Sequence, residues 1–126
     1  MTEAVTRPGT PPCIVTVAPH AEVTPRGAVF GGWILSQLDH AAGLAGRKIA
    51  GGDVVIASLK DVQFHAPLHG GEEFTIHAEL SRRGTSSFNL AVSAWAEPDG
   101  AGRRILSADV LLVAVDGAGR PRKLPA

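Results

Sequence analysis

The sequence predicts an α+β fold in which an antiparallel β-sheet wraps around one long central helix. Two patterns support this class: residues Phe30–Ala50 show the apolar spacing of a helix, and the chain after Asp53 alternates apolar and polar residues as strands do. Turn residues divide this second part into four strands. The helix is then the only element that can fill the concave face of the sheet.

The first predicted element is a short strand at Cys13–Ala18, and a loop at Pro19–Arg26 leads from it to the helix. Gly51 and Gly52 follow the helix and stop it. Period-two alternation then predicts the remaining strands, which carry Val55, Ala57 and Leu59; Phe74, Ile76, Ala78 and Leu80; Phe88, Leu90, Val92 and Ala94; and a last strand over about Arg104–Val115.

Turns separate these strands at Pro67 with Gly70-Gly71, at Gly84 and at Pro98-Asp99-Gly100. The last strand is apolar on both faces around Leu111–Val113, which favours a second covering layer or an interface. A homodimer is therefore expected.

Length and composition narrow the function classes. The 126 residues fit a single domain, predicted at residues 13–116, with flexible tails at residues 1–12 and 117–126. Lysine plus arginine and aspartate plus glutamate number 12 each, so no net field recruits nucleic acid or an anionic membrane. The lone Cys13 excludes an internal disulfide, and neither a signal peptide nor a membrane span is recognisable. We expect a cytoplasmic protein with no nucleic-acid or membrane partner.

The helix has two faces of different character. Its broad apolar face, which should enter the core, carries Phe30, Trp33, Ile34, Gln37, Leu38, Ala41, Leu44 and Ala45. A second stripe carries Asp39 among small residues, namely Gly32, Ser36, Gly43 and Gly46. Glycine within a helix costs about 0.5–1 kcal/mol relative to alanine, so this stripe suggests a functional site. The simpler interpretation is a solvent-facing aspartate.

A family resemblance rests on the motif Gly27-x-x-Phe30-Gly31-Gly32-Trp33-Ile34-Leu35-Ser36-Gln37-Leu38-Asp39. Three later segments extend it: Gly52-x-Val54-Val55, Phe64-x-x-Pro67 with Gly71, and Arg82-Arg83-Gly84-Thr85-Ser86-Ser87 with Trp95. Together they cover about residues 20–115. With these motifs the chain resembles the hotdog-fold acyl-CoA thioesterases, most closely the small bacterial YciA-like branch.

The resemblance implies hydrolysis of an acyl-CoA thioester at a homodimer interface, with dimers assembling further into tetramers or hexamers. It implies Asp39 as general base or nucleophile, and no cofactor beyond the coenzyme A of the substrate. The chemistry also needs donors for the oxyanion that develops on the carbonyl. The first-turn N–H groups of Gly31, and next of Gly32, are the predicted donors, because they are unpaired within the helix and lie at its positive end. The competing interpretation is that both glycines only let the helix approach the sheet.

The chain departs from the family pattern at two positions. Thr24 stands where many relatives have asparagine, and Ala28 stands where close relatives have an acidic residue. The Thr24 hydroxyl could still orient water or the carbonyl, although it lacks the second donor of an amide. Some hotdog thioesterases also use a hydroxyl from the strand after the helix, for which Ser58 is the candidate; the family threonine aligns instead with Ile56.

Coenzyme A carries phosphates, and the basic turn Arg82–Ser86 is the segment best suited to bind them. It offers the guanidinium groups of Arg82 and Arg83, the flexible Gly84, and donors at Thr85 and Ser86. A merely solvated turn is the alternative interpretation. His65 and His69 are separated by Pro67 and have no further ligand spacing, so no metal is predicted.

Two other functions stay open. A hotdog hydroxyacyl dehydratase would need a catalytic histidine paired with the helix acid, and His20 lacks the expected flanking pattern. A non-catalytic acyl-CoA-binding module would not need the acid, yet Asp39 is present, and 126 residues leave no room for a DNA-reading partner domain. The enzyme is therefore the first prediction.

Overall fold

The computed structural model describes residues 6–96 and 102–126. Its elements are β1 (Ile14–Val17), the 3-10 turn η1 (His20–Glu22), α1 (Gly31–Ala50), β2 (Val54–Phe64), β3 (Glu73–Arg83), β4 (Ser87–Ala96) and β5 (Arg103–Ala114). The predicted order of one strand, one long helix and four strands is confirmed. The turn predicted at Pro98–Gly100 and the start of the predicted N-terminal tail lie outside the described residues.

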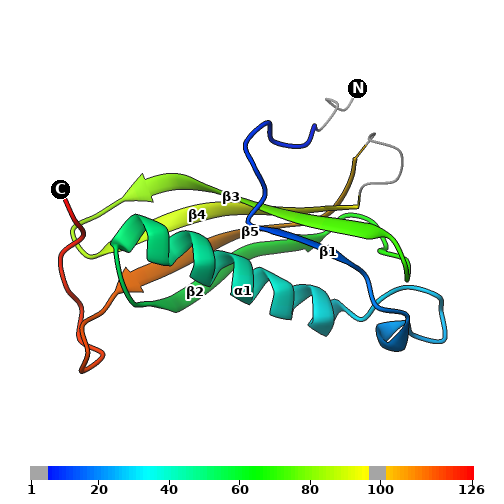
Figure 1. Cartoon of the computed structure of the whole chain (residues 1–126), viewed down its shortest axis with the longest axis horizontal. Coiled ribbons are helices and arrows are strands. Elements are labelled where there is room, and N and C mark those ends of the chain that lie inside the picture. Colours follow the sequence, from blue (N-terminus) through cyan, green and yellow to red (C-terminus); the bar gives the residue numbers. More distant parts are fainter. Residues whose placement is uncertain (1–5, 97–101) are drawn as a thin grey trace.

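The five strands form one antiparallel sheet in the order β1-β3-β4-β5-β2, and α1 crosses one of its faces (Figure 1). Alternating residues of β4 and β5 point toward the helix and are buried, among them Phe88, Leu90, Val110 and Leu112. The residues between them, such as Asn89 and Leu111, face the opposite side, because side chains alternate along a strand. The core therefore lies between α1 and the inner face of the sheet.

The helix ends where the sequence predicts. Gly51 adopts the left-handed conformation at φ 68°, and its N–H donates to the carbonyl of Arg47. Arg47 and Lys48 lie in the last turn, where positive charge offsets the negative end of the helix dipole. The start of the helix has no such support, because Phe30 occupies the N-cap and provides no side-chain cap.

The predicted core face of the helix is correct at its centre and wrong at its margins. Ile34, Leu38 and Ala41 are buried, whereas Phe30 and Leu44 are half exposed. Gly46, assigned to the stripe of Asp39, is instead buried, and a Cβ built on it would lie 2.9 Å from a methyl of Leu112. The buried side is shifted toward Ala42, Gly46 and Ala50, whose small size lets α1 approach the sheet closely.

Strand β2 forms one edge of the sheet, and its partner within the chain is β5. Its 11 residues include two register shifts, one between Ile56 and Ser58 and one between Lys60 and Gln63. Asp61 lies in the second shift with a left-handed φ of 52°. This bulge bends the strand before its last residues, which lead into the loop over the helix N-terminus.

The segment predicted as a flexible C-terminal tail is held by hydrogen bonds in the structure. The N–H of Arg122 donates to the carbonyl of Ala114, and the N–H of Leu124 donates to that of Thr85. The Arg122 guanidinium also donates to the carbonyl of Ala50 at the end of α1. Backbone pairing and a capping side chain leave no compositional signal, so these bonds could not be predicted from the sequence. No helix in the described residues has the length and hydropathy to cross a membrane.

Candidate active site

Asp39 lies on the exposed side of α1, two turns after the start of the helix. It borders a shallow surface pocket together with Gly43, Leu44 and Ile14 of β1. Within the described residues its carboxylate makes no hydrogen bond or ion pair. A carboxylate that has no partner in the described part of the chain is free to act on a group brought from outside.

The helix N-terminus presents two amide groups without acceptors. The N–H groups of Trp33 and Ile34 both approach the carbonyl of Phe30, whereas none of the bonds found in the described residues uses those of Gly31 and Gly32. A Cβ on Gly32 would meet no atom within 4 Å, and one on Gly31 would lie 3.4 Å from the ring of Phe64. These amides lie at the positive end of the helix, and the open space at the Cβ position of Gly32 leaves room for a ligand beside them.

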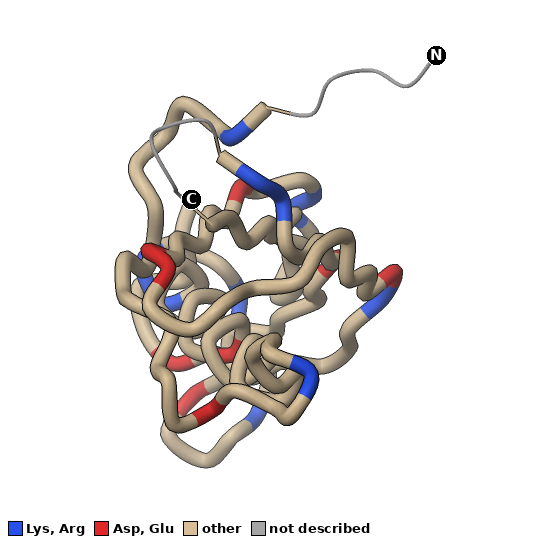
Figure 2. The backbone as a smooth tube through the Cα atoms, turned by 90° about the vertical axis from the view of Figure 1, so that its right-hand side faces the viewer, with Lys and Arg blue, Asp and Glu red and all other residues tan. Residues whose placement is uncertain are grey.

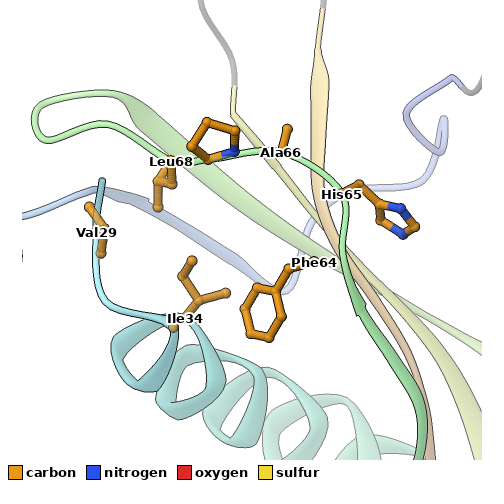
Figure 3. A pocket seen from close by; sticks show the side chains of 8 residues that line it. Val29, Ile34, Phe64, His65, Ala66 and Leu68 are labelled. Carbon is orange, nitrogen blue, oxygen red and sulfur yellow. The ribbon is translucent and has the colours of Figure 1, made fainter. Parts of the chain in front are cut away.

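A pocket of about 460 Å³ opens directly beside Gly31. Figure 3 shows the side chains of Val29, Ile34, Phe64 and Leu68 converging on it, while the ring of His65 points away. Ile34 and Leu68 are buried, at 3% and 1% exposure, so they form fixed walls. The site thus combines free backbone donors with an apolar cavity, which is the usual composition of a small-molecule site.

The loop that forms the far wall of this pocket is tied to the sheet. The Arg103 guanidinium donates to the carbonyl of Pro67 at 2.9 Å and to Glu72 Oε1 at 2.6 Å. Glu72 Oε1 also accepts from the N–H of His69 at 2.7 Å, and the N–H of Val29 donates to the carbonyl of Leu68. Local sequence patterns could not predict this arrangement, because Arg103 lies more than 30 residues from its partners.

Thr24 and Ser58 are not brought next to Asp39 within the chain. Thr24 belongs to a tight turn before the helix, where its Oγ1 accepts from the N–H of Arg26 at 3.2 Å. Ser58 pairs with Leu111, and cross-strand partners share a face. Because Leu112 points to the helix, Leu111 and Ser58 lie on the outer face, where Ser58 lines a polar pocket with Lys60 and Asp109.

The basic turn Arg82–Ser86 begins with the last two residues of β3, leads into β4 and lies near the C-terminal end of α1 (Figure 1). Both guanidinium groups have partners within the chain. Arg82 donates to Asn89 Oδ1 at 2.5 Å and to the hydroxyl of Ser87 at 2.9 Å, and Arg83 donates to the carbonyl of Pro125. Both side chains remain exposed, so they present oriented positive charge to solvent. Along the rest of the backbone, acidic and basic positions are interspersed (Figure 2).

Sequence comparison decides the family. Residues 26–115 match the Thioesterase superfamily. The chain belongs to this superfamily. It is 33% identical to the acyl-CoA thioester hydrolase YciA of Salmonella typhimurium over 115 residues, which are 87% of this chain and 86% of that protein.

Solved structures agree with this assignment. A hexameric thioesterase from Yersinia pestis superposes with a TM-score of 0.88 at 31% identity, covering 95% of this thioesterase and 99% of that chain. A hexameric hotdog-fold thioesterase of Campylobacter jejuni gives a TM-score of 0.81 at 30% identity, covering 90% of each chain. The predicted α+β hotdog class and the predicted family are both confirmed.

His65 of this thioesterase contacts Ser107, and a histidine beside a serine is also the arrangement of a serine hydrolase dyad. The Arg104 guanidinium, which can only donate, lies 3.4 Å from His65 Nδ1, and His65 Nε2 lies 2.7 Å from Ser107 Oγ. Burial and the Arg104 charge lower the pKa of His65, which favours the neutral ring. Nδ1 then accepts from Arg104, and Nε2 carries the proton toward Ser107. In this tautomer His65 cannot take a proton from the serine.

No group of three or more metal-ligating side chains occurs in the part of the chain that the structure describes. His20, the histidine considered for a dehydratase, packs against the turn of this thioesterase at Gly70, whose built Cβ would lie 2.8 Å from its Nδ1. Its contact is thus with the loop after β2.

Replacing Glu72 by Gln is expected to destabilise the thioesterase at neutral pH. Burial raises the pKa of Glu72, but the hydrogen bonds from Arg103 and His69 and their charges outweigh it, so the pKa lies below the ordinary value of 4.5. A lowered pKa stabilises the fold above the ordinary value, and this contribution disappears as the pH falls through the folded-state pKa. Glu72→Gln should lower the free energy of unfolding by about 1 kcal/mol at pH 7.

Urea unfolding at pH 7 and at pH 3.5 measures the effect, with Glu73→Gln as the matched control, because Glu73 is the exposed neighbour. The difference between wild type and Glu72→Gln should shrink at the lower pH. An equal difference at both pH values would contradict a role for the ionised carboxylate.

Proposed function

We propose that this thioesterase hydrolyses acyl-CoA to a free carboxylic acid and coenzyme A in a site shared between two copies of the chain. Asp39 acts as general base toward water or as nucleophile, and the N–H of Gly31, assisted by Gly32, binds the oxyanion. The names of its relatives, which are acyl-CoA thioester hydrolases, support the reaction. No cofactor is required beyond the coenzyme A that the substrate carries.

The spacing of Gly31 and Asp39 carries the proposal of a shared site. They are eight residues apart on one helix, which corresponds to about 12 Å along the axis at 1.5 Å per residue. A nucleophile and an oxyanion donor must each lie within roughly 3 Å of the same reacting group. One helix therefore cannot provide both to one carbonyl. A second helix that runs antiparallel beside the first would place its Asp39 near the Gly31 of its neighbour.

The free edge of β2 is the natural contact for this second copy. Two of its side chains before the bulge at Asp61, Val55 and Leu59, are 49% and 44% exposed, and among the described residues its backbone pairs only with β5. An unpaired edge of this length needs a cover, and pairing with the same edge of another copy is symmetric. The homodimer then forms a continuous sheet with the two helices side by side on one face.

The basic turn fits the same arrangement. Gly31 and Ala50 are the first and last residues of α1, so they are about 30 Å apart along the axis, and Arg82–Ser86 lies at the Ala50 end (Figure 1). A substrate whose carbonyl lies at Gly31 of one chain would approach the turn of the other. We assign Arg82 and Arg83 to the phosphates of coenzyme A, with Gly84, Thr85 and Ser86 as backbone and hydroxyl donors.

Four further assignments belong to this proposal. The Thr24 turn leads directly into the helix N-terminus, so its hydroxyl is assigned to orient substrate or water there. Ser58 lies on the outer side of the sheet, where its Oγ is buried and has no hydrogen-bond partner among the described residues; it is assigned as the hydroxyl that β2 offers to the shared site. Hexameric relatives support assembly of three dimers into a hexamer, and the protein is assigned to the cytoplasm.

Mixing two inactive variants tests the shared site. Asp39→Asn retains its Gly31 donors, and Gly31→Pro retains its Asp39. In a mixed dimer one of the two sites then combines an intact donor with an intact carboxylate. Co-expression at equal levels makes half of the dimers mixed, so activity should return to about a quarter of wild type by the symmetry of a two-fold dimer.

Thiol release from acyl-CoA is the measurement, and each variant expressed alone is the control. A co-expressed sample as inactive as its parents would mean that one chain supplies both groups. Wild-type protein that releases no thiol from any acyl-CoA would reject the hydrolase itself.

A further inference from the structure

The pocket beside Gly31 has one wall unlike the others. Val29, Ile34 and Leu68 are buried, and the loop that carries Leu68 is held by hydrogen bonds from Val29 and Arg103. Phe64, the last residue of β2, contributes the largest side chain of the lining and is 51% exposed. Figure 3 shows its ring facing Ile34 across the pocket. An exposed aromatic ring opposite a rigid wall can adapt to what binds between them.

The ring is also placed at the reacting end of the pocket. Its Cζ and Cε1 lie 3.4 and 3.6 Å from the position of a Cβ on Gly31, which is van der Waals contact. A thioester carbonyl that accepts from the Gly31 N–H therefore has the Phe64 ring beside it. Of the two substituents on that carbonyl, the polar coenzyme A arm must reach solvent and the basic turn. The acyl group is the substituent that gains from an apolar cavity.

We propose that Phe64 forms the adjustable wall of the acyl-binding pocket and limits the size of the acyl group that the thioesterase accepts. The inference rests on the proposed role of the Gly31 amide and adds the location of the acyl group to it. The acyl group packs between the Phe64 ring and Ile34, with Val29 and Leu68 closing the inner end. The pocket of about 460 Å³ is therefore filled from the Gly31 end inward, and the ring sets its free width.

Changing the size of this side chain should change the preference among substrates. Phe64→Ala widens the pocket, and Phe64→Trp narrows it. The kcat/KM of each variant is measured for straight acyl-CoAs from acetyl to palmitoyl and for benzoyl-CoA. Relative to wild type, Phe64→Ala should shift the ratio of bulky to small substrates upward by about 10-fold or more, in line with discrimination of 10–200-fold for a small change in a hydrophobic pocket. Phe64→Trp should shift it downward.

Leu80→Ala is the matched control, because Leu80 is also a large apolar side chain, 48% exposed, and lies on β3 outside the pocket lining. It should leave the ratio unchanged. Phe64→Leu repeats the test with a smaller loss of buried area if the alanine variant does not fold. An unchanged ratio in a folded Phe64 variant, or an equal loss for every substrate, would overturn the proposal.

Binding measurements separate this inference from the proposed function. In the Asp39→Asn background the same acyl-CoAs are titrated calorimetrically without turnover, with and without the Phe64 change. The dependence of Kd on acyl size should shift with Phe64 even there. A shift in Kd alongside inactive wild type would reject the hydrolase while keeping the acyl pocket. Full activity of the wild type, together with Kd values that do not change with Phe64, would keep the hydrolase and reject the acyl pocket.

Discussion

Replacing Asp39 by Asn should lower kcat for acyl-CoA hydrolysis by about 10²–10⁴-fold, the range that a positioned acid or base contributes. The change keeps the shape of the side chain and removes the oxygen that takes a proton or attacks the carbonyl. Because Asp39 is exposed and has no partner among the described residues, its replacement leaves no buried group unpaired. The melting temperature and the Kd for coenzyme A should therefore stay close to those of wild type.

Thiol release under saturating acyl-CoA measures the effect of Asp39→Asn. Glu79→Gln provides the matched control, since Glu79 is an exposed acid that lines a pocket on the outer face of the sheet. This control should retain wild-type kcat. If Asp39→Asn turned over substrate at the wild-type rate, the carboxylate would have no catalytic role, and the simpler interpretation of a solvated surface acid would replace it.

Replacing Gly31 by Pro should lower kcat by about 10²–10³-fold, the usual consequence of losing one oxyanion donor. Gly31 is the first residue of the helix, and this is the one helical position where proline is well tolerated. The preceding residue, Phe30, has φ −54° and ψ 135°, which a following proline permits. The substitution thus removes the N–H with little strain on the helix.

Gly31→Ala separates the loss of the N–H from the addition of atoms. It retains the donor and adds a Cβ at 3.4 Å from the Phe64 ring, an ordinary contact. Its kcat should exceed that of Gly31→Pro by at least about 10-fold if the donor matters, since removal of the donor alone costs more than that. Circular dichroism checks that both variants fold, and thiol release under saturating acyl-CoA gives their kcat values. Equal losses in both variants would assign the effect to crowding against Phe64.

The fold could be predicted because its signals are local. The change from helical to strand periodicity after Asp53 and the left-handed glycine at 51 both depend on a few neighbouring residues. The face of the helix was harder to predict, since a hydrophobic pattern ranks Leu44 above Gly46. In the structure, close packing on Leu112 buries the glycine and leaves the leucine half exposed. Contact distance, which periodicity cannot give, decided the outcome.

The candidate site was predicted only in part for a related reason. Asp39, Gly31 and the basic turn carry local chemistry that can be recognised in a sequence. The wall formed by Phe64 and the support of Arg103 for the 67–72 loop depend on which strands become neighbours. Strand β2 shows the opposite limit, because alternation places Val55 and Leu59 on one face, whereas the bulge after Ile56 pairs them with Val113 and Val110, which lie on opposite faces. One inserted residue in a strand reverses an assignment based on alternation.

The exposed edge of β2 also affects the tendency of newly synthesised chains to aggregate. A long apolar edge is a template for aggregation as well as for a partner, because any extended segment can add to its open backbone groups. Lys60 and the left-handed Asp61 interrupt this edge with charge and a bend. In the proposed dimer, pairing between copies would therefore use the first half of the strand, and the second half is a poor seed for unlimited stacking. While chains fold, formation of the proposed dimer competes with aggregation along the same edge. The bulge favours the dimer.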